Sequence, residues 1–179
     1  MREQLFETET IIKDAEISRC GQYRYWLSRI WDRDKPFCTW IMLNPSTADA
    51  SVDDPTIRRC INFTRQWEYG GLYVVNLFAF RATDPKHLKQ FNKPVVDENW
   101  INIMHYATMA GKVVVAWGNH GGYLKASEIT ITLLSRNKIT PYCLGVTSIG
   151  QPKHPLYIKS DTKPTLFTRT AAEQAGGEG

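Results

Sequence analysis

Polar residues that follow apolar runs carry the chemistry that this sequence offers. Asn44, Asn76 and Gly118 each stand where an apolar run ends, and His154 lies in a late Lys-His-Pro-Leu segment. A carboxamide presents a donor and an acceptor together, so it can read the donor–acceptor edge of a nucleobase. An imidazole can act as an acid or as a hydrogen-bond donor near neutral pH.

The apolar runs alternate with segments of helical spacing. We expect strands at four of the runs: 37–43, 72–77, 113–117 and 141–146. We expect helices between and after them, at 55–68, at a short segment opened by Asp84-Pro85, at 95–109 and at 123–136. This alternation predicts an α/β three-layer sandwich with a mainly parallel four-stranded sheet. Ligands of such sheets bind outside the carboxyl ends of the strands, so the four polar positions can line one crevice.

An N-terminal β-hairpin is expected to extend one edge of this sheet. Its arms are the aromatic-rich runs 23–31 and 37–43, which flank the turn-forming segment 32–36. The domain organisation that we predict is an N-terminal segment at 1–20, one α/β domain at 21–160, and a C-terminal tail at 161–179 whose last four residues are disordered.

Composition limits the classes of protein. The chain has 179 residues, of which 42% are hydrophobic, and this length suits one core. Four cysteines fit no zinc or iron–sulfur spacing, so we predict buried free thiols, no metal and no cofactor. No signal core or membrane-length apolar run is present, so we expect a cytoplasmic protein without membrane contact, and a monomer. The net charge of +4 is compatible with a polyanionic partner.

Each candidate residue also has a structural interpretation. Asn44 with Pro45 can form a simple turn, and Asn76 can make a structural hydrogen bond to a neighbouring loop. Asp49, Asp53 or Asp54 can serve as a general base or as a metal ligand, and Asp53 or Asp54 can instead cap the following helix. His154 can begin a His-Pro turn whose following residues pack inward.

Longer strings carry a resemblance to known families. MLNPSTADASVDDPTIRRC, LYVVNLFAFRATDP and GQPKHPLY resemble an uncharacterised bacterial and phage family of unknown function, over about 23–157. More distantly, the ordered motifs resemble the uracil-DNA glycosylase superfamily: a strand ending in Asn-Pro, a strand ending in Asn, a strand ending in Trp-Gly, and a late His-Pro loop. The second resemblance implies a uracil-DNA glycosylase-like fold.

The glycosylase resemblance also implies residue roles. Asn44 would position water or stabilise the sugar cation, Asn76 would bind the base edge, and His154 would stabilise the departing base. Leu156 would be the wedge residue, and Ser46, Thr47 and Lys153 would contact phosphates. Independently of the resemblance, Arg58 and Arg81 recur near the proposed crevice and are added to the DNA-binding set. One aromatic residue would stack on the extruded base, the candidates being Phe63, Phe78 and Trp67.

The sequence departs from the superfamily's pattern in the first and last motifs. Asn44 stands where the most active uracil-removing branch has an aspartate, so direct deprotonation of water is expected only if Asp49, Asp53 or Asp54 substitutes, and a slower or differently specific enzyme follows. We place Asp49 in the catalytic set. The late loop reads His-Pro-Leu-Tyr rather than His-Pro-Ser, which affects the phosphate contact.

The expected function is therefore that of a DNA glycosylase-like enzyme. It would hydrolyse the N-glycosidic bond of a flipped damaged or modified base, a pyrimidine in the first instance, with DNA as its partner. Two alternatives stay open. One is a non-catalytic nucleic-acid or nucleotide-binding module, and the other is an enzyme that processes free nucleosides or nucleotides.

Overall fold

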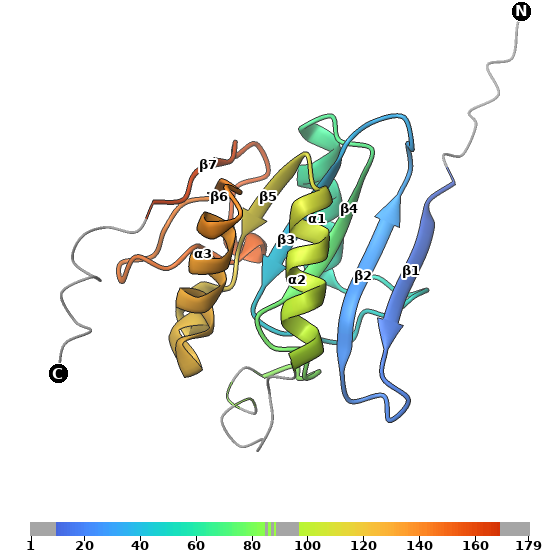
Figure 1. The fold of residues 1–179 in the computed structure, drawn as a ribbon. Helices are drawn as coiled ribbons and strands as arrows, with labels where there is room; N and C mark the ends of the chain where they lie inside the picture. Colours follow the sequence, from blue (N-terminus) through green and yellow to red (C-terminus); the bar gives the residue numbers. More distant parts are fainter. Residues whose placement is uncertain (1–9, 85, 87, 89–96, 169–179) are drawn as a thin grey trace, which may run out of the picture.

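Apolar runs form the parallel centre of one mixed sheet (Figure 1). The computed structural model describes residues 10–84, 86, 88 and 97–168. Within this part of the chain the strand order is β1-β2-β4-β3-β5-β6-β7. The strands are β1 (Ile12–Ile17), β2 (Arg24–Ile30), β3 (Phe37–Met42), β4 (Gly71–Asn76), β5 (Lys112–Val115), β6 (Pro141–Cys143) and β7 (Thr165–Leu166). The predicted α/β class is confirmed.

The sheet is larger than predicted, because antiparallel strands are added at both edges. Strands β4, β3, β5 and β6 run parallel, at the four places where strands were expected. Strands β2 and β7 pair antiparallel with β4 and β6, and β1 pairs antiparallel with β2. The sequence gives little sign of β1 because it is an edge strand with mostly exposed residues, which leaves no apolar alternation.

The predicted hairpin of 23–31 with 37–43 is wrong. Strand β4 lies between the two arms, pairing Val74 with Leu27 on one side and with Trp40 on the other. Gly71 permits this insertion, since a Cβ there would lie 2.8 Å from the carbonyl oxygen of Arg29. The hairpin at this edge is formed by β1 and β2 instead.

Three helices cover the sheet in the described ranges. They are α1 (Pro55–Gln66), α2 (Asp97–Met109) and α3 (Ala126–Arg136), which confirms the helices expected at 55–68, 95–109 and 123–136. Two 3₁₀ segments, η2 (Gly118–Lys125) and η3 (Pro155–Tyr157), occupy the glycine-rich turn and the late loop. Pro85, the first residues of the 95–109 segment and the tail 176–179 lie outside the described residues.

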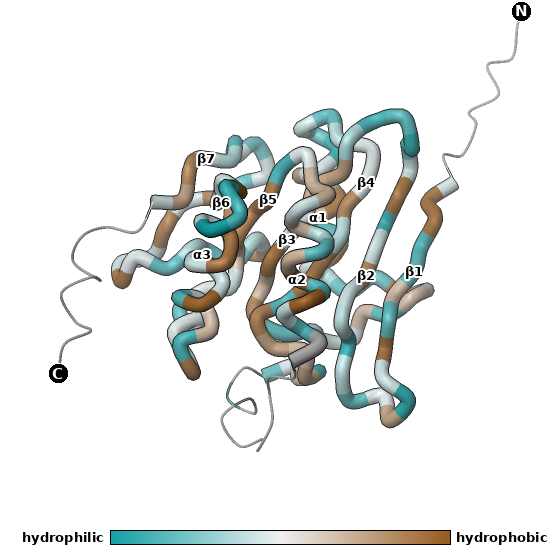
Figure 2. Tube along the Cα trace, in the orientation of Figure 1, coloured by the Kyte–Doolittle hydropathy of each residue, from teal (hydrophilic) through white to brown (hydrophobic). Residues whose placement is uncertain are grey.

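The helices lie on both faces of the sheet and produce two cores. Ile57 of α1 packs with Trp40, whereas Ile103 of α2 and Leu134 of α3 pack with Ile41 on the opposite face. Neighbouring residues of β3 thus enter different cores, as expected for a central parallel strand. Figure 2 shows the hydrophobic colouring that follows from this along β3 and β5. The layers are helix, sheet and helix.

The cysteines only partly follow the prediction of buried free thiols. All four are free, and Cys38, Cys60 and Cys143 are buried, but Cys20 is exposed between β1 and β2. Burial raises the pKa of the Cys60 thiol well above its usual range, so this group is an unreactive core residue. Among the described residues, no helix is both long enough and apolar enough to span a membrane.

A buried arginine of β2 holds the irregular segment that connects β3 to α1. Arg29 has no exposed surface and donates from Nε to Oδ1 of Asp53 at 2.6 Å. Its Nη2 donates to the carbonyl oxygens of Asp49 at 2.7 Å and of Val52 at 3.3 Å. Lys13 adds a second ion pair to Asp53 at 2.7 Å. The position of this connection therefore depends on the guanidinium.

Replacement of this guanidinium should destabilise the fold. Arg29→Met keeps an apolar stem but leaves Oδ1 of the largely buried Asp53 carboxylate and two carbonyl groups without their donor. We expect a loss of about 3–5 kcal/mol in the free energy of unfolding, measured by denaturant titration. The exposed Arg33→Met is the control, with a change below about 0.5 kcal/mol. Equal midpoints for the two variants would contradict the anchoring role.

Candidate active site

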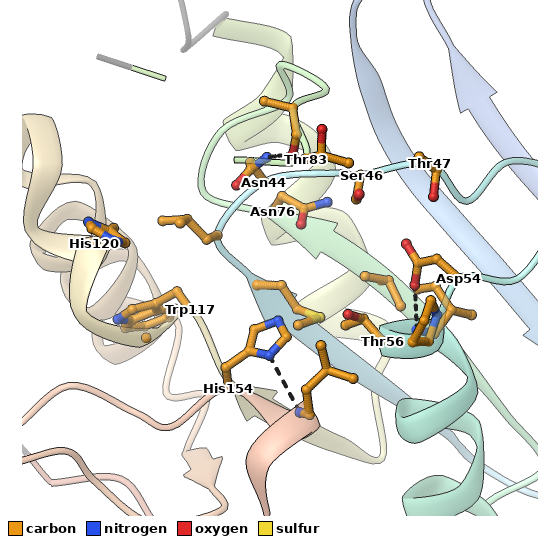
Figure 3. A pocket seen from close by; sticks show the side chains of 18 of the residues that line it. Asn44, Ser46, Thr47, Asp54, Thr56, Asn76, Thr83, Trp117, His120 and His154 are labelled. Carbon is orange, nitrogen blue, oxygen red and sulfur yellow. Dashed lines mark hydrogen bonds between the residues drawn. The ribbon is translucent and has the colours of Figure 1, made fainter. Parts of the chain in front are cut away.

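A cavity of about 680 Å³ lies at the carboxyl ends of β3, β4 and β5 (Figure 3). This volume is in the range of small-molecule sites. Its walls come from the segment after β3, the end of β4, the segment after β5, the start of α1 and the late loop around η3. Eight residues that the sequence singled out line it: Asn44, Ser46, Thr47, Asp54, Asn76, Gly118, His154 and Leu156.

Asn44 is held in one orientation by backbone acceptors. Its Nδ2 donates to the carbonyl oxygen of Ala82 at 2.6 Å and to that of Pro45 at 3.1 Å. Because both partners are acceptors, the amide nitrogen must face them, which fixes the position of Oδ1. The side chain therefore combines a turn-stabilising role with a carbonyl-type acceptor at the cavity wall.

Asn76 lies at the floor of the cavity as the last residue of β4. It is 1% exposed, and its Nδ2 donates no hydrogen bond to any of the described residues. Asn99 of α2 fixes the local backbone by donating to the carbonyl oxygens of Asn76 at 2.8 Å and of Leu77 at 3.0 Å. A buried unpaired donor costs about 1–3 kcal/mol, so such a group is typical of a site that a ligand completes.

His154 presents a neutral imidazole to the cavity. The backbone N–H of Leu156 donates to its Nδ1 at 3.4 Å, so the proton of the neutral ring is on Nε2. Burial lowers the pKa of His154 below 6.5, and the nearby charge of Asp54 partly opposes this shift. At neutral pH the residue is therefore an uncharged hydrogen-bond donor.

Two charged residues of the cavity were not placed in the predicted catalytic or DNA-binding sets: Asp54 was one of three candidate bases, and Arg24 was not singled out. Asp54 caps α1, since its Oδ1 accepts from the backbone N–H of Ile57 at 2.8 Å, and it also lines the cavity. Arg24 of β2 is 2% exposed and donates from Nη1 to the carbonyl oxygen of Ala48 at 2.9 Å. Burial lowers the pKa of Arg24 to about 10, which leaves it charged at neutral pH. The sequence feature that could have pointed to Arg24 is a charged residue inside the aromatic-rich run 23–31, which was expected to be a strand.

Trp117 and Gly118 form the wall that follows β5. The Trp117 indole is 2% exposed and donates from Nε1 to Oε1 of Gln151 at 2.8 Å. A Cβ on Gly121 would lie 2.1 Å from Cδ1 of this indole, so the glycine is needed for the ring to pack. Gly118 has a φ of +71° and donates its N–H to the carbonyl oxygen of Pro152 at 2.9 Å.

Asp49 does not line the cavity. Its Oδ1 accepts from the N–H groups of Ser51 and Val52, both at 2.8 Å, and from the Ser51 hydroxyl at 3.0 Å. These hydrogen bonds lower the pKa of Asp49 to about 2, which makes it a weak base. Asp53 is occupied by its ion pairs with Arg29 and Lys13.

The remaining predicted residues lie away from the cavity lining. Phe63 is 1% exposed in the core on the α1 side of the sheet, where Trp67 stacks on Trp40 with ring centroids 5.5 Å apart, and Phe78 is fully buried in the other core.

The three predicted basic residues are also absent from the cavity lining. Arg58 donates to the carbonyl oxygen of Asp53, Arg81 donates to those of Ser46 at 3.4 Å and Gly21 at 3.2 Å, and Lys153 is exposed beside His154.

The fold and the site define an α/β protein with a pocket at the carboxyl ends of its parallel strands. Residues 24–156 match the family described as "Protein of unknown function (DUF1643)", and the chain belongs to this family. No curated protein and no solved structure matches the chain. The predicted membership of a family of unknown function is confirmed, while the likeness to uracil-DNA glycosylases stays a prediction.

The electrostatic contact between His154 and Asp54 can be tested by titration. We expect His154 to titrate below pH 6.5, and we expect Asp54→Asn to lower its pKa further, because the carboxylate stabilises the imidazolium form. Imidazole chemical shifts followed by NMR against pH measure both values. Asp34→Asn, an exposed change in the turn before β3, is the control. An unchanged His154 pKa in Asp54→Asn would contradict the contact.

Proposed function

We propose that this protein is a DNA glycosylase-like enzyme that hydrolyses the N-glycosidic bond of an extruded damaged or modified base, with pyrimidines as the expected class. One observation carries the proposal. Asn44, Asn76 and His154 come from three distant segments and line one cavity, in the chain order of the motifs that resemble the uracil-DNA glycosylase superfamily.

Base recognition is assigned to the floor of the cavity. The unpaired Nδ2 of Asn76 would donate to an acceptor on the Watson–Crick edge of the extruded base. Asn99 holds the backbone that carries this amide, so the donor is fixed before the base arrives. Extrusion costs a few kcal/mol, which this hydrogen bond and the DNA contacts would offset.

Bond cleavage is assigned to His154 and Asn44. As the bond between C1′ and the base nitrogen breaks, its electron pair moves to the base, and the Nε2–H of His154 would stabilise the negative charge that forms there. A neutral imidazole suits this role because it donates without adding a charge to the ground state. The fixed Oδ1 of Asn44 would align the attacking water.

DNA contact is assigned to the rim formed by the late loop. Leu156 is 37% exposed and Tyr157 is 88% exposed, both directly after His154. An apolar side chain in this position can enter the space that a flipped nucleotide leaves in the base stack. Lys153 is exposed on the same loop and would contact a phosphate.

Base release from oligonucleotides is the direct test. The protein is incubated with single- and double-stranded oligonucleotides that carry uracil, hydroxymethyluracil and other modified pyrimidines, and free base is measured by mass spectrometry. We expect release that falls by about 10²–10³-fold in His154→Ala, because a donor to the developing charge is lost. His105→Ala, an exposed change on α2, is the matched control.

The other outcomes identify the alternatives. DNA binding that weakens with salt, with no base released from any substrate, would indicate a non-catalytic binding module. Turnover of free nucleosides or nucleotides without any response to DNA would indicate an enzyme of nucleotide metabolism. Either result would overturn the glycosylase proposal.

A further inference from the structure

The segment between β3 and α1 contains three carboxylates, and the structure separates their roles. Asp49 accepts three local hydrogen bonds, and Asp53 is ion-paired with Arg29 and Lys13. Neither residue lines the cavity, whereas Asp54 does. Since Asn44 cannot accept a proton from water at neutral pH, the site needs another base for hydrolysis.

Asp54 has one carboxylate oxygen committed and one available. Its Oδ1 accepts from the backbone N–H of Ile57 at 2.8 Å, which orients the side chain at the first turn of α1. Its Oδ2 makes no hydrogen bond within the described part of the chain. Figure 3 shows Asp54 and His154 on different walls of the pocket, with Asn76 and Asn44 on a third side.

The charged and titratable groups around Asp54 come from three elements. Arg24 of β2 and His154 of the late loop both interact electrostatically with its carboxylate. Arg58 lies one helical turn further along α1 and donates to the carbonyl oxygen of Asp53. Arg24 is a buried cation whose Nε has no partner among the described residues, and it interacts electrostatically with Asp54, the only acidic residue among the described residues that line the cavity.

We propose that Asp54 is the general base that activates the hydrolytic water, a role that rests on the proposed glycosylase function. Asp54 Oδ2 takes one proton from water as the water oxygen forms its bond to C1′. The bond from C1′ to the base nitrogen breaks, and its electron pair leaves with the base. Asp54 then releases its proton to solvent, and the departing base takes a proton from solvent, so atoms and charges balance.

The substitution Asp54→Asn separates catalysis from helix capping. Asparagine is as good an N-cap residue as aspartate, so its Oδ1 can still accept from Ile57, but it cannot take a proton. We expect an unchanged denaturation midpoint and a rate of base release that falls by about 10²–10⁴-fold.

Asp49→Asn tests the rival carboxylate under the same conditions. Activity retained in Asp54→Asn and lost in Asp49→Asn would overturn the assignment in favour of Asp49. Activity retained in both variants, with wild-type release intact, would overturn the assignment and leave the proposed function standing. Wild-type protein that releases no base from any substrate would overturn both proposals, so the two failures are distinguishable.

Discussion

The ion pair between Arg29 and Asp53 fixes the irregular segment on which the site depends. This segment has little regular structure of its own, and its carbonyl groups receive donors from the buried guanidinium. A buried arginine costs desolvation free energy, and its hydrogen bonds offset this cost only when the geometry is complete. Because Asp53 is held, the next residue, Asp54, is placed at the start of α1 and at the cavity wall.

Sheet register gives the site its second constraint. Asn76 pairs with Met42 across the parallel ladder, and the N–H of Leu77 donates to the carbonyl oxygen of Met42 at 2.8 Å. The first polar residue after β3, Asn44, must therefore lie near the end of β4. This adjacency exists only because β4 is inserted between β2 and β3. Strand pairing, and not closeness in the sequence, thus brings these polar residues together at the cavity.

The candidate site contains buried polar groups that lower the stability of the fold. The amide nitrogen of Asn76 and the Nε of Arg24 are buried without partners in the described part of the chain. Backbone groups bind Nδ2 of Asn44 and Nδ1 of His154. These hydrogen bonds fix the positions of the other polar atoms, Oδ1 of Asn44 and Nε2 of His154. Such pre-arranged donors and acceptors are useful where charge develops during a reaction. Burial of apolar side chains in the two cores stabilises the fold and offsets the cost of these polar groups.

The sequence by itself determined the local elements, and the tertiary structure decided their pairing and the site. A short apolar run such as 72–77, which follows Gly70-Gly71, favours a buried strand, and Asp54-Pro55 begins a helix through local hydrogen bonds. Strand pairing depends on residues far apart in the chain, so the insertion of β4 and the edge strand β1 could not be read locally. For the same reason, the sequence could not tell which of Asp49, Asp53 and Asp54 faces the cavity, and only the fold places Asp54 there.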